Sequence, residues 1–245
     1  MNQISNIIIS VLLLLCGIII SGSLSAQDIK ACSLKVEYME DPAGVNIPDP
    51  RLSWIPISSA RGSKQSAWQI EVAGSVEDLL NSGPKVWDTG KTRSSNSVNI
   101  VYEGQPLETG QTYFWRVRLW DKNGEAGVWS DIAGFHVGPM NNSDWHGKWI
   151  GPADIKNSSP ILRREFSLNK PVAEAYAYIV GLGYYELYLN GEKVGDHVLD
   201  PGTTDYSKRV LYSAYDVTDY LKSGSNAVGA WLGNGWFIHR MRKQY

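Results

Sequence analysis

The sequence of 245 residues is poor in cysteine and in net charge, and it lacks long stretches of helical periodicity. Its two cysteines are Cys16, inside an apolar stretch, and Cys32. If the segment that contains Cys16 is removed, Cys32 has no partner for an intramolecular disulfide. Stability must then come from an apolar core. The formal net charge of −2 excludes nucleic acid as an expected partner, because phosphate binding requires a basic surface. The missing 3.6-residue periodicity excludes a helical bundle.

Charged side chains are absent from residues 1–26, and residues 7–20 are almost wholly apolar. Small residues follow this run, so we expect a secretory signal peptide over residues 1–26, cleaved before Gln27. The alternative is an uncleaved anchor, because residues 4–24 approach the roughly 20 residues that span a bilayer. We therefore expect export to the periplasm, the cell surface or the medium, with no membrane contact beyond this segment.

The sequence is rich in aromatic residues with a polar atom, with 10 Trp and 13 Tyr against 4 Phe. Such rings pack the interiors of β-sandwiches and also form platforms for sugars. Short clusters of β-branched and aromatic residues alternate with Gly, Pro, Asn and Asp, which is typical of all-β proteins. We predict two tandem β-sandwiches after the signal peptide. A fibronectin type III-like sandwich is expected over residues 27–140, and a jelly-roll or carbohydrate-binding-like sandwich over 141–245.

The clusters predict seven strands in the first half, at residues 35–38, 51–55, 68–73, 85–88, 97–101, 113–121 and 134–137. A short helix is expected at 75–81. Trp115 lies in the middle of an alternating strand, so we expect it in the core rather than on a ligand platform. The second half predicts strands at residues 161–168, 173–181, 184–189, 192–194, 209–216 and 226–232, with a short helical turn or loop at 217–222.

The sequence contains no recognisable motif for catalysis or cofactor binding. No G-x-S-x-G occurs, and Gly181-Leu182-Gly183 lacks both the third glycine and the following helix of a phosphate loop. The four histidines are scattered without zinc spacing. The oxygen-bearing side chains of Asn190, Asp196, Asp200 and Asp205 could gather around calcium, but solvated turns explain them better. We expect no catalytic residue, no metal and no cofactor.

The remaining candidates are rings and hydrogen-bonding side chains near the C-terminal end. We predict substrate binding by four residues in or beside loops, namely Asp205, Tyr206, Asn234 and Trp236. A ring can stack on the apolar face of a sugar while Asp and Asn bind its hydroxyl groups. Trp236 could equally pack against a neighbouring domain. Trp231 lies within a predicted strand, so we expect it in the core. The segment 145–152, with two tryptophans, is expected to pin one domain against the next.

Four motifs in order carry a resemblance to a known family. They are the GLGYYELYLNG of residues 181–191, the LDPGTTDYSKR of 199–209, the DVTDYL of 216–221 and the WLGNGW of 231–236. Together they resemble the N-terminal sandwich domain of bacterial α-L-rhamnosidases of glycoside hydrolase family 78. The first half and the segment 145–152 resemble the N-terminal arrangement of that family. Thr203 departs from the pattern, since the family usually has Trp there.

The resemblance implies an accessory part of an inverting hydrolase that releases terminal α-L-rhamnose. The two carboxylic residues of this hydrolysis belong to an (α/α)₆ barrel, which follows the sandwich in the family and matches nothing here. The resemblance therefore implies an inactive N-terminal fragment whose partners are the missing barrel and, weakly, a rhamnose-containing glycan. The alternatives are a stand-alone carbohydrate-binding module and a structural or adhesive surface protein.

Overall fold

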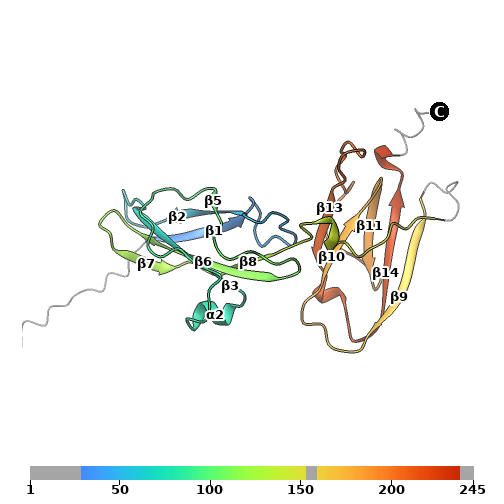
Figure 1. The fold of residues 1–245 in the computed structure, drawn as a ribbon, viewed down its shortest axis with the longest axis horizontal. Helices are drawn as coiled ribbons and strands as arrows, with labels where there is room; N and C mark the ends of the chain where they lie inside the picture. Colours follow the sequence, from blue (N-terminus) through green and yellow to red (C-terminus); the bar gives the residue numbers. More distant parts are fainter. Residues whose placement is uncertain (1–28, 153–158, 238–245) are drawn as a thin grey trace, which may run out of the picture.

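The computed structural model describes residues 29–152 and 159–237, and the predicted signal peptide lies outside them. Strands dominate the described chain, which confirms the all-β fold class, and Figure 1 shows two separate sheet-rich bodies joined by the segment after β8. Within the described ranges no helix is long and apolar enough to cross a membrane.

The first sandwich consists of two antiparallel sheets. One sheet has the order β1-β2-β5, formed by β1 (Lys30–Val36), β2 (Arg51–Ile57) and β5 (Ile100–Val101). The other has the order β4-β3-β6-β7, with β8 also paired to β6. Its strands are β3 (Ala67–Ala73), β4 (Trp87–Asp88), β6 (Thr112–Trp120), β7 (Ala126–Trp129) and β8 (Ala133–His136).

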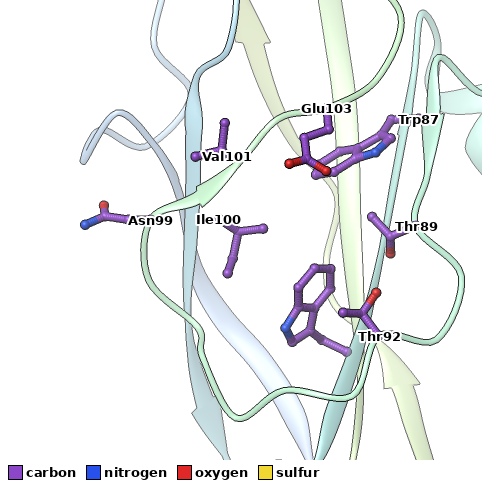
Figure 2. A pocket seen from close by; sticks show the side chains of 8 residues that line it. Trp87, Thr89, Thr92, Asn99, Ile100, Val101 and Glu103 are labelled. Carbon is purple, nitrogen blue, oxygen red and sulfur yellow. The ribbon is translucent and has the colours of Figure 1, made fainter.

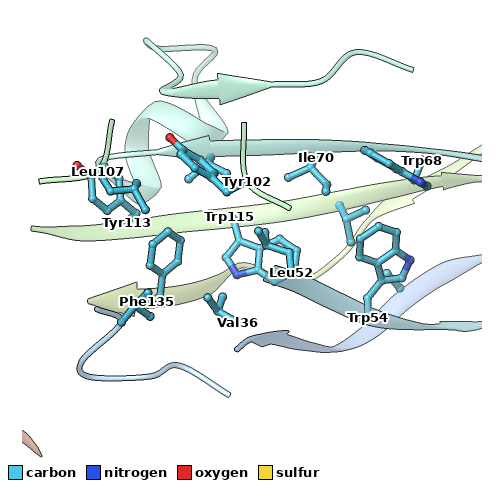
Figure 3. Close-up of a cluster of buried hydrophobic side chains, with 14 of the residues drawn as sticks. Val36, Leu52, Trp54, Trp68, Ile70, Tyr102, Leu107, Tyr113, Trp115 and Phe135 are labelled. Atoms are coloured by element: carbon cyan, nitrogen blue, oxygen red, sulfur yellow. The ribbon is translucent and has the colours of Figure 1, made fainter. Parts of the chain in front are cut away.

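Strand β6 shows why this half folds as a sandwich. Its side chains alternate between buried and half-buried, as the period of two in a strand requires. Trp115, Val117 and Leu119 have no exposed surface, so the prediction that Trp115 lies in the core is confirmed. Figure 3 shows these rings and aliphatic side chains meeting between the two sheets. The alternation predicted from sequence therefore places one face of β6 in the core.

The predicted short helix is present as α2 (Val76–Leu80). Ser75 caps its N-terminus, where the hydroxyl oxygen accepts a hydrogen bond from the backbone N–H of Asp78 at 3.1 Å. Leu79 is completely buried and attaches the helix to the core. The cap at Ser75 and the buried Leu79 explain why a helix of little more than one turn forms in a β-sandwich.

Two strand predictions in the first half were wrong in position or missing. The first strand was expected at 35–38, but β1 ends at Val36. Glu37 and Tyr38 adopt positive φ angles of 50° and 68°, so the chain turns there and Met39 pairs back with Val36. Strand β7 was not predicted as a separate strand, although it follows the turn at residues 121–125 that reverses the chain after β6.

The second sandwich has a four-stranded sheet in the order β12-β11-β14-β9 and a separate pair, β10-β13. The strands are β9 (Ile161–Leu168), β10 (Tyr176–Val180), β11 (Tyr184–Leu189), β12 (Glu192–Lys193), β13 (Tyr212–Asp216) and β14 (Gly224–Gly233). Two 3₁₀ turns accompany them, η1 (Asn142–Asp144) and η2 (Thr218–Tyr220). Asn190 and Gly191 both have positive φ and form the tight hairpin between β11 and β12.

Trp231 contradicts the expectation that it lies in the core. It is 46% exposed although it lies within β14, near the C-terminal end of the strand. Its indole Nε1 donates a hydrogen bond to the hydroxyl of Ser159 at 2.7 Å. The expectation failed because the strand's outer face, not its inner one, carries this ring, and a strand position alone does not say which face is covered.

Candidate functional site

An open groove of about 1050 Å³ lies in the second sandwich. It lies against both sheets, because its walls include residues of β10 and β13 on one side and of β9, β11 and β14 on the other. The segment 145–150 also contributes to its wall. The apolar lining includes Trp149, Ile150, Leu162, Ile179 and Leu232. The sandwich is therefore open along a face that would normally be filled by core side chains.

Incomplete burial of the strands explains the groove. All five residues of β10 are only half-buried, and Trp149 and Ile150 are 68% and 76% exposed. In the described part of the chain, β10 pairs only with β13. A two-stranded sheet with half-covered side chains exposes both backbone edges and apolar surface. This combination makes the groove a candidate docking surface.

The glycine motif before β11 serves backbone packing rather than phosphate binding. A Cβ on Gly183 would lie 2.5 Å from the carbonyl oxygen of Gly233, and one on Gly235 would lie 2.9 Å from the Cα of Gly183. Both glycines have positive φ, 101° and 51°. The two glycine-rich segments can therefore touch only without side chains, and this contact positions Asn234 and Trp236 at the end of β14.

Two of the four predicted sugar-binding residues lie in the turn at 205–209. The carboxylate of Asp205 accepts a hydrogen bond from the hydroxyl of Ser207 at 2.7 Å and lies 3.7 Å from the ammonium of Lys208. The ring of Tyr206 meets the ring of Phe237 edge-on, with centroids 5.3 Å apart. That contact brings the turn to the segment after β14, where Asn234 and Trp236 are exposed.

The four predicted residues thus come from two segments that the structure joins. None of them lines the large groove. The side chain of Trp236 is 54% exposed. Their binding of sugar stays a prediction.

The carboxylate of Asp200 is held by hydrogen bonds from neighbouring side chains. It accepts hydrogen bonds from Tyr185 at 3.1 Å and Tyr215 at 3.0 Å, and also from Ser213. Burial opposes its ionisation, but the hydrogen bonds from Ser213, His197 and the two tyrosines prevail and lower the pKa of Asp200. Asn190 instead donates to Tyr220 and Asn226. Among residues 29–152 and 159–237 no metal-binding group of His, Cys, Asp and Glu occurs.

An interdomain joint connects the two sandwiches, formed by His136 of β8, Tyr176 and Tyr178 of β10, Tyr212 of β13 and Trp145. His136 is only 4% exposed and stacks on Tyr176 with centroids 3.4 Å apart. Its Nε2 lies 2.5 Å from the hydroxyl of Tyr178, and its Nδ1 lies 2.8 Å from the hydroxyl of Thr112. Burial lowers the pKa of His136, which keeps the ring neutral.

Trp145 completes the joint. Its ring meets Tyr212 and Tyr178 edge-on, with centroids 5.2 and 6.5 Å away. Tyr212 in turn contacts the first sandwich, where its hydroxyl reaches the carbonyl oxygen of Gly44 at 3.4 Å. The expectation that the segment 145–152 pins the domains therefore holds for Trp145. The role of His136 was missed, because a lone histidine in the sequence carries no signal of the tyrosines that cover it.

The fold and the groove define the class: two consecutive β-sandwich modules, of which the second carries an open groove. Two family models match in the same order. The N-terminal immunoglobulin domain of Rha78A-like proteins matches residues 31–141, and the α-L-rhamnosidase N-terminal domain matches residues 170–245. The chain therefore corresponds to the N-terminal domains of α-L-rhamnosidases.

Relatives and solved structures agree with this assignment. Curated α-L-rhamnosidases of Formosa agariphila and Alteromonas sp. are 38% and 39% identical over 80% and 86% of this chain. The solved α-L-rhamnosidases of Dictyoglumus thermophilum and Aspergillus terreus superpose with TM-scores of 0.79 and 0.73, at 41% and 30% identity over 85% of this chain. The chain spans only 23% to 25% of the length of these four proteins. It thus corresponds to an accessory region of such an enzyme.

Proposed function

We propose that this chain is the N-terminal accessory part of an exported α-L-rhamnosidase and that it has no hydrolase activity by itself. The open groove of the second sandwich carries the proposal. Its walls are apolar, and in the described residues the pair β10-β13 has no further strand beside it. These features fit a polypeptide that adds a strand to this pair and places side chains in the groove. The proposed occupant of the groove is the part of an α-L-rhamnosidase that lies outside the quarter of the enzyme matched by this chain. That part would also supply the two carboxylic residues of hydrolysis.

The proposal is tested by fragment complementation. The 245-residue chain is expressed with the portion of the Dictyoglumus thermophilum enzyme that lies outside the match, and binding and hydrolysis of an aryl α-L-rhamnoside are measured. We expect the two to copurify, and we expect turnover only with the second polypeptide present. Turnover by the purified chain alone would refute its inactivity, and absence of binding would refute the docking role of the groove.

A matched pair of variants assigns binding to the groove. Ile150→Asp places a charge in its wall, where the isoleucine is 76% exposed, and Leu80→Asp places one on α2, where the leucine is 62% exposed. Because an apolar side chain contributes about 1.5–3 kcal/mol on burial, Ile150→Asp is expected to weaken binding at least about tenfold. Leu80→Asp is expected to leave it unchanged. Equal effects of both variants would place the contact elsewhere.

The finer parts of the proposal concern sugar and export. Asp205, Tyr206, Asn234 and Trp236 are proposed to contact a rhamnose unit of a plant glycan, supported by the contact of Tyr206 with Phe237. Trp236→Ala should then abolish a rhamnose-induced change of tryptophan fluorescence. Fusion of residues 1–26 to a reporter tests export, and retention of the reporter in the cytoplasm would exclude a signal peptide.

A further inference from the structure

Residues 195–199, which follow β12 in the second sandwich, form an exposed loop that is fixed at both ends. Before the loop, the backbone N–H of Val194 donates to the carbonyl oxygen of Leu187 at 2.8 Å. After it, the carbonyl oxygen of Asp200 accepts from the backbone N–H of Tyr185 at 3.0 Å, and the carboxylate of Asp200 is held by the side-chain hydrogen bonds described above. All five residues between these attachments are exposed. The loop therefore projects from a fixed base.

Two aliphatic side chains occupy the end of this loop. Val198 and Leu199 are 75% and 71% exposed, and among the large hydrophobic residues of the described chain only Ile150, at the groove, is more exposed. Leu199 also has a positive φ of 56°, a region that is unfavourable for a bulky side chain and that favours glycine. Leu199 thus adds backbone strain while burying little of its side chain within its own sandwich. Such a combination indicates a contact with another molecule.

The base of the loop is continuous with the wall of the groove. Tyr185, whose backbone is bonded to Asp200, lines the groove, and Gly181 lines it as well. A Cβ on Gly181 would lie 3.2 Å from the Cδ of Pro201, two residues after the end of the loop. A polypeptide that fills the groove at Gly181 and Tyr185 therefore lies beside the base of the loop.

We propose that Val198 and Leu199 form a second docking contact for the part of an α-L-rhamnosidase that lies outside the quarter matched by this chain. This inference rests on the proposed function and extends the docking surface from the groove to the loop. Neither side chain offers a hydrogen bond or an aromatic ring, the groups that recognise sugars, whereas an apolar hollow on a protein would bury both. The fixed base holds the two side chains in place, which reduces the entropy lost on binding.

The test uses the complementation pair, the full chain with the remaining portion of the Dictyoglumus thermophilum enzyme. The dissociation constant is obtained from a dilution series, and the melting temperature of the free chain is measured in parallel. Leu199→Gly removes the aliphatic side chain and suits the positive φ, so it should weaken binding about tenfold without lowering the melting temperature. Leu199→Met keeps an apolar side chain of similar volume and should retain most of the binding. A lower melting temperature of Leu199→Gly with unchanged affinity would assign the leucine to folding and overturn the proposal.

A matched pair of valines locates the contact. Val198→Asp places a charge at the end of the loop and should weaken binding at least about tenfold. Val101→Asp is the control, because Val101 is an exposed valine of β5 in the first sandwich, beside a lateral cavity of about 540 Å³ (Figure 2). This control should bind as the unaltered chain does. Equal losses in the two variants would contradict the assignment to the loop.

Further outcomes separate this proposal from the proposed function. Binding that is weakened by Ile150→Asp but retained in Leu199→Gly and Val198→Asp refutes the loop contact and leaves the groove as the docking surface. Absence of any binding refutes both. Self-association of the free chain that Leu199→Gly abolishes would identify a second copy of the chain as the occupant. Flotation with phosphatidylcholine vesicles that Val198→Asp abolishes would identify a lipid surface, and either of these last two results overturns the proposal.

Discussion

The two sandwiches differ in how completely they bury their own residues. The first has a core of seventeen buried residues, many of them with no exposed surface, and the second has a core of six that are 3% to 8% exposed. Both have strands rich in aromatic residues, mainly Trp in the first and mainly Tyr in the second. The difference is that the first closes two sheets over one another, whereas the second leaves β10 and the groove half-covered. A sandwich that buries its own core can stabilise itself, and the proposed docking of a further part of the enzyme would cover the open groove of the second.

The largest expected effect compares two tryptophans that lie within strands. Trp115→Ala should destabilise the first sandwich by about 3–5 kcal/mol, because the ring is completely buried and its loss leaves a cavity. Trp231→Ala should cost about 1 kcal/mol or less, because that ring is 46% exposed. Denaturation in guanidinium, followed by circular dichroism, measures both. Equal losses would remove the distinction between the two cores.

A smaller effect is expected where the two sandwiches meet. A Cβ on Gly44 would collide with the Cβ of Ala214, so Gly44→Ala should force the joint apart at a cost of about 1–3 kcal/mol. Gly147→Ala is the control, since nothing lies within 4 Å of its Cβ position. Small-angle scattering should show a longer particle for the first variant only. An unchanged scattering profile would show that the close approach does not hold the sandwiches together.

The joint should also respond to pH through His136. Burial holds its pKa below the ordinary 6.5 in the folded protein, so the unfolded chain takes up the proton first as pH falls. Stability conferred by the joint is therefore complete above pH 6.5 and declines as pH falls from there toward the folded pKa. Glu174 and Asp216 raise the pKa and so reduce the effect. Thermal unfolding between pH 7.5 and 5.5 should lose this dependence in His136→Asn, and an identical slope in that variant would assign it to another group.

The smallest effect concerns a local element of the closed sandwich. Ser75→Ala removes the cap of α2 and should destabilise it by about 1 kcal/mol. Ser75→Thr keeps the hydroxyl that accepts from the Asp78 N–H and donates to its carboxylate, and it serves as the control. The second sandwich should keep its unfolding transition in both variants, and a shift of that transition would mean that the two sandwiches unfold as one unit.

The sequence was sufficient wherever a local pattern decides the structure. Alternation predicted β6, and the short helix expected at 75–81 is present as α2. It was insufficient where one strand's environment depends on another strand. Trp231 follows the same pattern as a core tryptophan, and only the sheet order shows that its side is not covered.

The candidate sites divide in the same way. The sequence singled out Asp205, Tyr206, Asn234 and Trp236, and the structure joins their two segments through Tyr206 and Phe237. It gave no indication of the groove, because the segment 145–150 and the strands that form its walls are brought together only by the tertiary fold.

By itself the sequence determined the β-rich fold, the division into two sandwiches and the family, because these depend on short-range periodicity and on ordered motifs. Only the tertiary structure decided which side chains are covered, how His136 and Trp145 connect the sandwiches and where the surface remains open. The physical reason is that burial is a property of surfaces that meet in space. A residue pattern shows which side chains a strand presents on each face. The packing of the sheets decides whether another element covers that face.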